Sequence, residues 1–208
     1  MSINLKLIDD AVNEFSKLPG IGRRTAMRFV LYLLKKELNE VERFANTIVE
    51  LRRNIRYCKI CHNISEMEVC DICSNRNRDN SLICVVEDIR DVIAIENTMQ
   101  YKGLYHILGG IISPLQNIGP NDLNINTLLN RVNDGGVKEV ILALRTTIEG
   151  DTTNHYIYRK LMSLNKKDII ITMIARGVAV GEDLEYTDEI TLGLSISNRF
   201  PFENIISK

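Results

Sequence analysis

Two Cys-x-x-Cys pairs, separated by eight residues, offer four thiols to a single metal ion. Cys58 and Cys61 form the first pair, and Cys70 and Cys73 form the second. Each pair can present two thiolates to one ion, and two pairs complete a tetrahedral site of four sulfurs. Zinc suits this donor set, with a rubredoxin-like iron centre as the alternative. Because four protein ligands leave no open position for water, we expect a structural site rather than a catalytic one.

Two disulfides are the other reading of the four cysteines, but they require an oxidising compartment. Residues 1–10 do not have the pattern of a signal peptide, and no apolar run is long enough to span a bilayer. We therefore expect a reduced cytoplasmic protein in which the cysteines bind metal. Cys84, inside an apolar run, is expected in the core, and His62 is expected to lie beside the metal site rather than in it.

A short hairpin, Leu18–Gly22, separates two stretches with apolar residues at helical spacing. Its sequence, Leu-Pro-Gly-Ile-Gly, is typical of a helix–hairpin–helix motif. Gly20 and Gly22 allow a tight turn and a close approach of the backbone to another surface. The amides that open the second helix would then point outward and form an anion site.

Arg23, Arg24 and Arg28 follow the hairpin directly and could add contacts to a phosphate backbone. Such contacts carry no base information, so the predicted DNA binding is sequence-independent and salt-sensitive. The alternative is a plain helical hairpin with a solvated basic end. Local charge agrees with the DNA interpretation: residues 1–60 carry 12 Lys and Arg against 7 Asp and Glu, whereas residues 61–208 carry 14 against 20.

From Leu82 onward, buried strands alternate with helices, which predicts an α/β domain with a mostly parallel sheet. The predicted strands are Leu82–Val86, Tyr105–Leu108, Glu139–Leu144 and Asp168–Ile174. The predicted helices are residues 89–99, Asn124–Asn133 and Asp151–Leu164.

Acidic residues follow two of these strands, where functional groups gather in parallel sheets. Glu87 closes the first strand, and Glu149 and Asp151 flank Gly150 in what reads as a tight turn that directs both side chains one way. Such carboxylates could hold Mg²⁺. Asp151 could equally be the N-cap of its helix, and no nucleophile or base accompanies the acids.

In their order along the chain, these motifs resemble the RecR family of recombination mediators nearly from end to end. The resemblance also rests on later segments, which are Gly109–Pro114, Ile118–Pro120, Ile174–Gly177 and Gly181–Tyr186. The family implies a helix–hairpin–helix domain, a four-cysteine zinc finger, a Toprim domain and a C-terminal tail with a helix. On this chain the expected boundaries are 1–56, 57–79, 80–175 and 176–208.

The resemblance also implies a non-catalytic protein that assembles into a tetrameric ring and works with RecO-type and RecF-type partners. These proteins help to load RecA onto gapped or single-stranded DNA, which places this chain at the nucleoid. By position, Arg24 and Arg28 match DNA-facing residues, and Glu87, Glu149 and Asp151 match Toprim acids credited with partner contacts. Where family members often have Asn-Pro, this chain has Arg145-Thr146, and the added positive charge argues against Mg²⁺.

Two rival functions follow from the same residues. The acids would suit a Mg²⁺-dependent Toprim nuclease or topoisomerase. A zinc-stabilised interaction module without a DNA role would leave the hairpin arginines unexplained.

Overall fold

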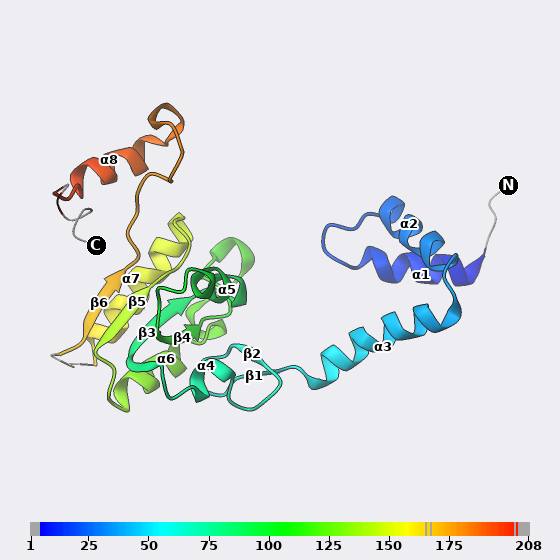
Figure 1. Ribbon diagram of the computed structural model, residues 1–208, viewed down its shortest axis with the longest axis horizontal. Helices are drawn as coiled ribbons and strands as arrows, with labels where there is room; N and C mark the ends of the chain where they lie inside the picture. The colour runs from blue at the N-terminus through cyan, green and yellow to red at the C-terminus, as the bar shows by residue number, and fades with distance from the viewer. Residues whose placement is uncertain (1–4, 165, 167, 202, 204–208) are drawn as a thin grey trace. The chain divides into compact units, whose positions relative to one another are not determined.

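The computed structural model describes residues 5–164, 166, 168–201 and 203, and it divides into two compact units (Figure 1). Met1–Ile55 form the first unit and Arg56–Lys208 the second. No helix among the described residues is long and apolar enough to cross a membrane.

The described residues of the first unit form three helices, α1 (Lys6–Ser16), α2 (Arg23–Leu33) and α3 (Leu38–Asn54). The predicted helical spacing is confirmed, because α1 and α2 pack together around Val12, Ala26 and Val30. The third helix has no buried residue.

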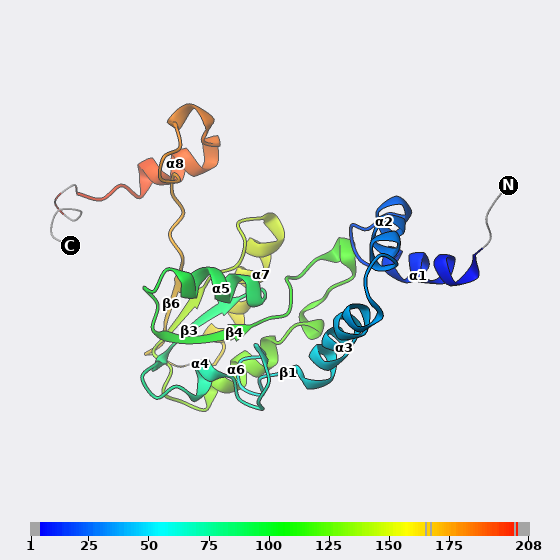
Figure 2. The same cartoon turned by 45° about the vertical axis from the view of Figure 1, so that its right-hand side comes forward.

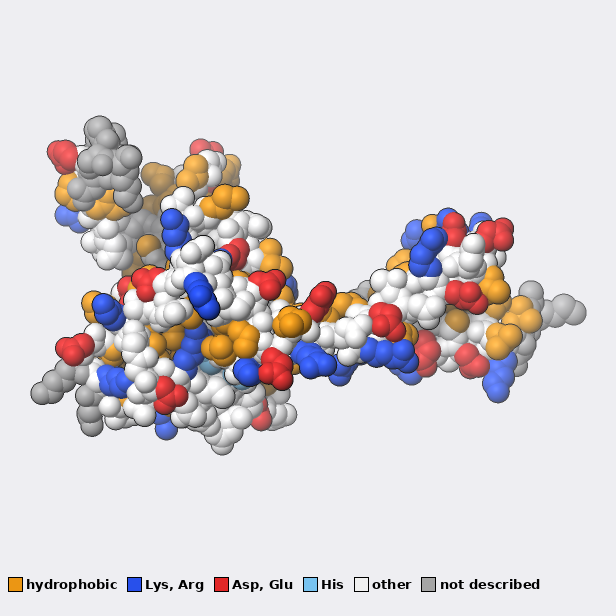
Figure 3. Space-filling model, turned by 60° about the horizontal axis from the view of Figure 1, so that its bottom comes forward, with side chains coloured by type: hydrophobic (Ala, Val, Ile, Leu, Met, Phe, Trp, Pro, Cys, Tyr) orange, Lys and Arg blue, Asp and Glu red, His pale blue; other side chains and the backbone are white. Residues whose placement is uncertain are grey.

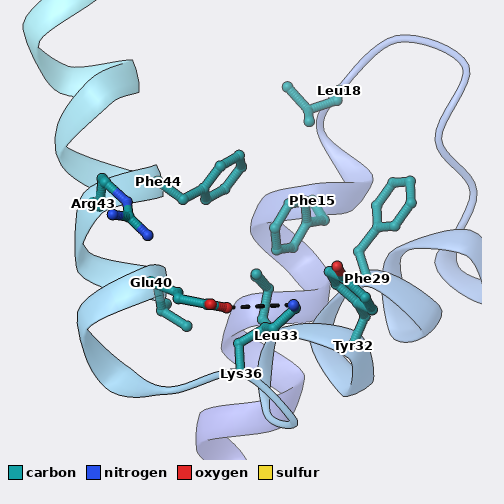
Figure 4. Close-up of a pocket in the computed structure, with 10 residues that line it drawn as sticks. Phe15, Leu18, Phe29, Tyr32, Leu33, Lys36, Glu40, Arg43 and Phe44 are labelled. Atoms are coloured by element: carbon teal, nitrogen blue, oxygen red, sulfur yellow. Dashed lines mark ion pairs between the residues drawn. The ribbon is translucent and has the colours of Figure 1, made fainter.

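An apolar pocket of about 520 Å³ lies within this unit, lined by residues of α1, α2 and α3 (Figure 4). Phe15 and Phe44 point into the space between the helices from α1 and α3. Lys36 and Glu40 form an ion pair of 3.3 Å at its edge. The first unit therefore leaves much of its apolar surface uncovered.

The second unit is built on a four-stranded parallel sheet with the order β4-β3-β5-β6, which confirms the predicted α/β domain. The strands begin and end within a few residues of the predicted limits. They are β3 (Asp79–Val86), β4 (Gly103–Ile107), β5 (Glu139–Leu142) and β6 (Ile170–Met173).

Helices cover both faces of this sheet (Figure 2). The side chains of Ile83 and Val85 face α6 (Ile125–Asn133) and α7 (Ile148–Met162). Because strand side chains alternate, Cys84 and Val86 face the other way, toward α5 (Ile89–Asn97). The buried position of Cys84, at 2% exposure, confirms it as a core thiol.

Shorter elements complete the second unit. Before the sheet lie the strands β1 (Arg56–Tyr57) and β2 (Ile64–Ser65) and the helix α4 (Asp71–Ser74). Two 3₁₀ turns, Pro114–Gln116 and Pro120–Asp122, follow β4, and after β6 come a third, Leu184–Tyr186, and α8 (Glu189–Ser197). Of the expected C-terminal segment, residues 202 and 204–208 lie outside the described residues.

Candidate metal centre and nucleic-acid interface

The four cysteines are presented by a two-stranded hairpin and the start of a short helix. β1 and β2 pair antiparallel, and the turn between them carries Cys58 and Cys61. Cys70 is the N-cap residue of α4, and Cys73 lies within that helix. Two turns that are adjacent in sequence thus direct both pairs of thiols toward one point.

The sulfur atoms lie close enough to bind one ion. All four Sγ atoms are within 4.8 Å of one another, and no other group of three His, Cys, Asp or Glu ligands in the described chain meets this criterion. Cys58, Cys61 and Cys70 are buried. None of the cysteines forms a disulfide, and the Sγ atoms of Cys61 and Cys70 are 3.5 Å apart. The disulfide reading is therefore wrong for this structure, and the site fits a tetrahedral ion.

The pKa values of these thiols also indicate that a cation is needed for all four to ionise together. A hydrogen bond between the thiols of Cys61 and Cys70 lowers the pKa of Cys70 and raises the pKa of Cys61. The thiolate form of Cys70 is therefore favoured, while the thiol of Cys61 is held in its protonated form. A divalent ion would allow all four sulfurs to ionise together, as zinc does in sites with four cysteine ligands.

The finger is joined to the sheet by polar contacts. The backbone N–H of Ile107 in β4 donates to the carbonyl oxygen of Cys61 at 2.8 Å. His62, with a left-handed φ of 62°, places its Nε2 2.8 Å from Thr127 Oγ1 in α6. His62 is therefore a neighbour of the metal site, and it connects the finger to the domain behind it.

His106 is the buried partner of this connection. Its ring lies 5.3 Å from that of His62, and its Nε2 is 2.8 Å from the carbonyl oxygen of Asn124. Burial lowers the pKa of His106 to about 3, so the ring is neutral at physiological pH. His106 is fully buried and therefore has a packing role.

The hairpin between α1 and α2 exposes backbone amides. Gly20 has a φ of 77°, which favours glycine, and the N–H of Ile21 donates to Leu18 O at 3.1 Å. Gly22 is the N-cap of α2, and no side chain caps that helix. A Cβ at Gly20 or Gly22 would meet no atom of the described residues within 4 Å. The first amides of α2 therefore remain accessible to an anion.

The three hairpin arginines differ in their contacts. Arg23 binds α1, with Nη2 2.7 Å from Asp9 Oδ1 and Nη1 2.9 Å from Asn13 Oδ1. Arg24 and Arg28 have no side-chain hydrogen bond or ion pair within the described residues. Arg23 thus ties the two helices together, whereas the other two guanidinium groups are available to a ligand.

At the carboxyl edge of the sheet, two of the three predicted acids are paired with arginines. Arg145 binds Glu87 through two nitrogen atoms, with Nε 2.6 Å from Oε2. Arg176 binds Asp151. Glu149 lies near Asp151 in the first turn of α7. Among the described residues these carboxylates form no group of three possible metal ligands, and Arg145 holds both oxygens of Glu87, so the arrangement does not fit Mg²⁺.

The predicted acidic turn is a helix, and its predicted cap is wrong. α7 begins at Ile148, and its N-cap is Thr147, whose hydroxyl accepts from the N–H of Gly150 at 3.2 Å. Asp151 is therefore inside the first turn. Gly150 is required for another reason, because a Cβ there would overlap the carbonyl oxygen of Arg145.

Some site residues could not be singled out from sequence. Thr147 could have been, since a threonine before a helix is a capping signal. The pairing of Arg176 with Asp151 and of His62 with Thr127 left no local signal, because each pair is far apart in the chain.

Comparison with family models divides the chain in the order expected. The RecR helix-hairpin-helix model matches residues 8–52, and the RecR zinc finger model, which is defined by four cysteines, matches residues 55–75. A Toprim domain matches residues 81–175, and the RecR C-terminal model matches residues 177–199. With the geometry above, the four cysteines form a structural zinc site.

Curated relatives match over almost the whole chain. A Recombination protein RecR from Bacteroides thetaiotaomicron is 60% identical over 200 residues, which is 96% of each chain. That from Bacteroides fragilis is 58% identical over the same length and the same shares. That from Flavobacterium psychrophilum is 53% identical over 204 residues, or 98% of each chain. The chain therefore belongs to the RecR family of recombination proteins.

Proposed function

We propose that this protein is a DNA-binding, non-catalytic recombination mediator that holds the phosphate backbone through its helical hairpin. The observation that carries this proposal is that no side chain caps the N-terminus of α2. Uncapped amides follow Gly22, and Arg24 and Arg28 lie within the next turn and a half without internal partners among the described residues. Backbone amides and arginines together are the groups that bind phosphate oxygens.

Binding of this kind is independent of base sequence. Phosphate contacts position a protein on DNA, whereas base-edge contacts would be needed to read it. In this proposal Arg24 and Arg28 make the main contacts. Arg23 supports the hairpin, because a phosphate would have to compete with Asp9 and Asn13 for its guanidinium.

The non-catalytic part of the proposal rests on the carboxyl edge. Two of its predicted acids are engaged by arginines, and among the described residues these acids do not join a group of three possible metal ligands. A Mg²⁺-dependent nuclease would need carboxylates free to bind metal. In this proposal the carboxyl edge of the sheet contacts a partner protein instead.

The partners and assembly belong to the same proposal. Membership of the RecR family supports a ring-shaped homotetramer that acts with RecO-type and RecF-type proteins. Together they would load RecA onto gapped or single-stranded DNA at the nucleoid.

The proposal predicts the salt dependence of DNA binding. Fluorescence anisotropy with three labelled gapped DNAs of unrelated sequence should give similar Kd values at each salt concentration. The logarithm of the affinity should fall linearly with the logarithm of salt concentration, because bound phosphates release counterions. A strong preference for one DNA sequence, or a Kd that does not change with salt concentration, would contradict phosphate-backbone binding. The same DNAs incubated with Mg²⁺ should remain intact on a denaturing gel.

A further inference from the structure

Nearly all of the acidic side chains at the carboxyl ends of β3 and β5 already have internal partners. Arg145 occupies both oxygens of Glu87, whose side chain is 13% exposed. Arg90 binds Asp88, with Nε 2.9 Å from Oδ2. One oxygen of Asp91 accepts from the backbone N–H groups that follow β3, at 3.0 and 3.1 Å. The acids that would attract a cation are therefore largely neutralised from within.

Among these arginines, Arg145 occupies the position that a divalent cation would take beside Glu87. A divalent ion at this edge would need oxygen atoms of Glu87 as ligands. The guanidinium forms a two-point ion pair with that carboxylate, linking the end of β3 to the segment after β5. A metal ion could bind only by displacing it, against both charge repulsion and two charge-assisted hydrogen bonds.

The backbone of Arg145 is held in place by the start of α7. Its carbonyl oxygen accepts from Thr147 N–H at 3.0 Å and lies against Gly150, where any Cβ would overlap it. Thr147 in turn caps α7. The guanidinium is thus delivered to Glu87 by a fixed turn rather than by a mobile loop.

A second arginine repeats the arrangement from the next strand. Arg176 follows β6 and pairs with Asp151 in the first turn of α7. Its side chain is 24% exposed, so this pair is partly shielded from water.

From these contacts we infer that Arg145 acts as a built-in cation that excludes divalent metal from the carboxyl edge and keeps this Toprim domain metal-independent. Glu87 is the carboxylate that Arg145 occupies. Arg176 plays a supporting part at Asp151.

Titration with Mn²⁺, followed by the electron paramagnetic resonance signal of the free ion, tests this role. The zinc-loaded full-length protein should show no saturable Mn²⁺ site. Arg145→Ala should show a saturable Mn²⁺ site, with an affinity at least about tenfold above the limit that the titration sets for the parent, since the competing charge is gone. The double variant Arg145→Ala with Glu87→Gln should lose the gain. Circular dichroism and zinc content establish that each variant is folded.

Arg90→Ala is the matched control, because it frees Asp88 from an arginine while leaving Arg145 on Glu87. It should bind Mn²⁺ no better than the parent. The inference is overturned if the parent already binds Mn²⁺ through Glu87, if Arg145→Ala gains nothing, or if the gain survives Glu87→Gln. An equal gain in Arg90→Ala would also overturn it, since any lost positive charge would then suffice. None of these results depends on DNA binding by the hairpin.

Discussion

At the scale of single residues, close packing at Gly150 determines how the carboxyl edge is built. The carbonyl oxygen of Arg145 occupies the space in which a side chain at position 150 would begin, so the helix and the preceding turn can meet only at glycine. The same contact orients the residue whose side chain binds Glu87. One small residue therefore supports both the fold and the charge arrangement of this edge.

Gly150→Ala should lower the free energy of unfolding by about 2–3 kcal/mol, because the added methyl group forces the Arg145 backbone away. Urea denaturation of the zinc-loaded protein, followed by circular dichroism, measures the change. Gly193→Ala is the matched control: a methyl group added to this helical glycine in α8 would meet no atom within 4 Å in the part of the chain that the structure describes. It should be neutral or stabilising by up to about 1 kcal/mol. Equal effects at the two positions would show that helix propensity, not packing, governs position 150.

Some residues of the site were predictable and others were not, for a physical reason. The four cysteines could be predicted as a site because the spacing within each pair fixes the local geometry. Gly20 could be predicted as a turn residue because the turn needs a left-handed φ, which glycine adopts readily. Arg145 and Glu87 are 58 residues apart, and their contact exists only after two strands pair. The added charge of Arg145 was therefore visible in the sequence, but its partner was not.

At the scale of elements, the zinc finger depends on its metal. Its strands contain two residues each and α4 has four, so the finger has little hydrogen-bonded structure of its own. Apart from Cys58, Cys61 and Cys70, few of its side chains are buried. The four ligands must therefore supply most of the stability of this element.

Cys61→Ser should abolish stoichiometric zinc binding and unfold the finger, because three thiolates and a hydroxyl bind zinc less well. Zinc content by mass spectrometry and the rate of proteolysis near residues 56–75 provide the measurement. Cys84→Ser is the control, since Cys84 lies in the sheet core and not in the cluster. It should keep about one zinc per chain. Full zinc content in Cys61→Ser would remove that cysteine from the site.

Element types were easier to predict than their ends. The apolar runs indicated all four parallel strands. For β3, β4 and β5 the reason is burial, because strands covered on both faces are largely apolar. β6 is apolar as well, but its end residues Ile170 and Met173 are exposed. The start of α7 was misplaced by three residues, since Glu149-Gly150-Asp151 reads as a turn when the contact of Gly150 with Arg145 is unknown. The finer division into 1–56, 57–79, 80–175 and 176–208 stays a prediction.

At the scale of the whole molecule, charge is distributed unevenly between the two parts of the chain. Residues 1–60 carry an excess of basic side chains, and residues 61–208 an excess of acidic ones. On the face shown in Figure 3, however, acidic and basic side chains of the second unit are interspersed. Contact with DNA is therefore expected to depend on the first unit, where the hairpin lies.

The central claim is that the helical hairpin binds DNA phosphates, and charge reversal at two arginines tests it most directly. Anisotropy of a labelled gapped DNA should show that Arg24→Glu with Arg28→Glu weakens binding by at least about tenfold at about 50 mM salt, because attraction becomes repulsion. Arg159→Glu with Lys160→Glu, at exposed positions on α7, makes the same change in net charge. That control should bind DNA within about twofold of the parent. If the hairpin variant is folded, keeps its zinc and binds DNA as tightly as the parent, the account is contradicted.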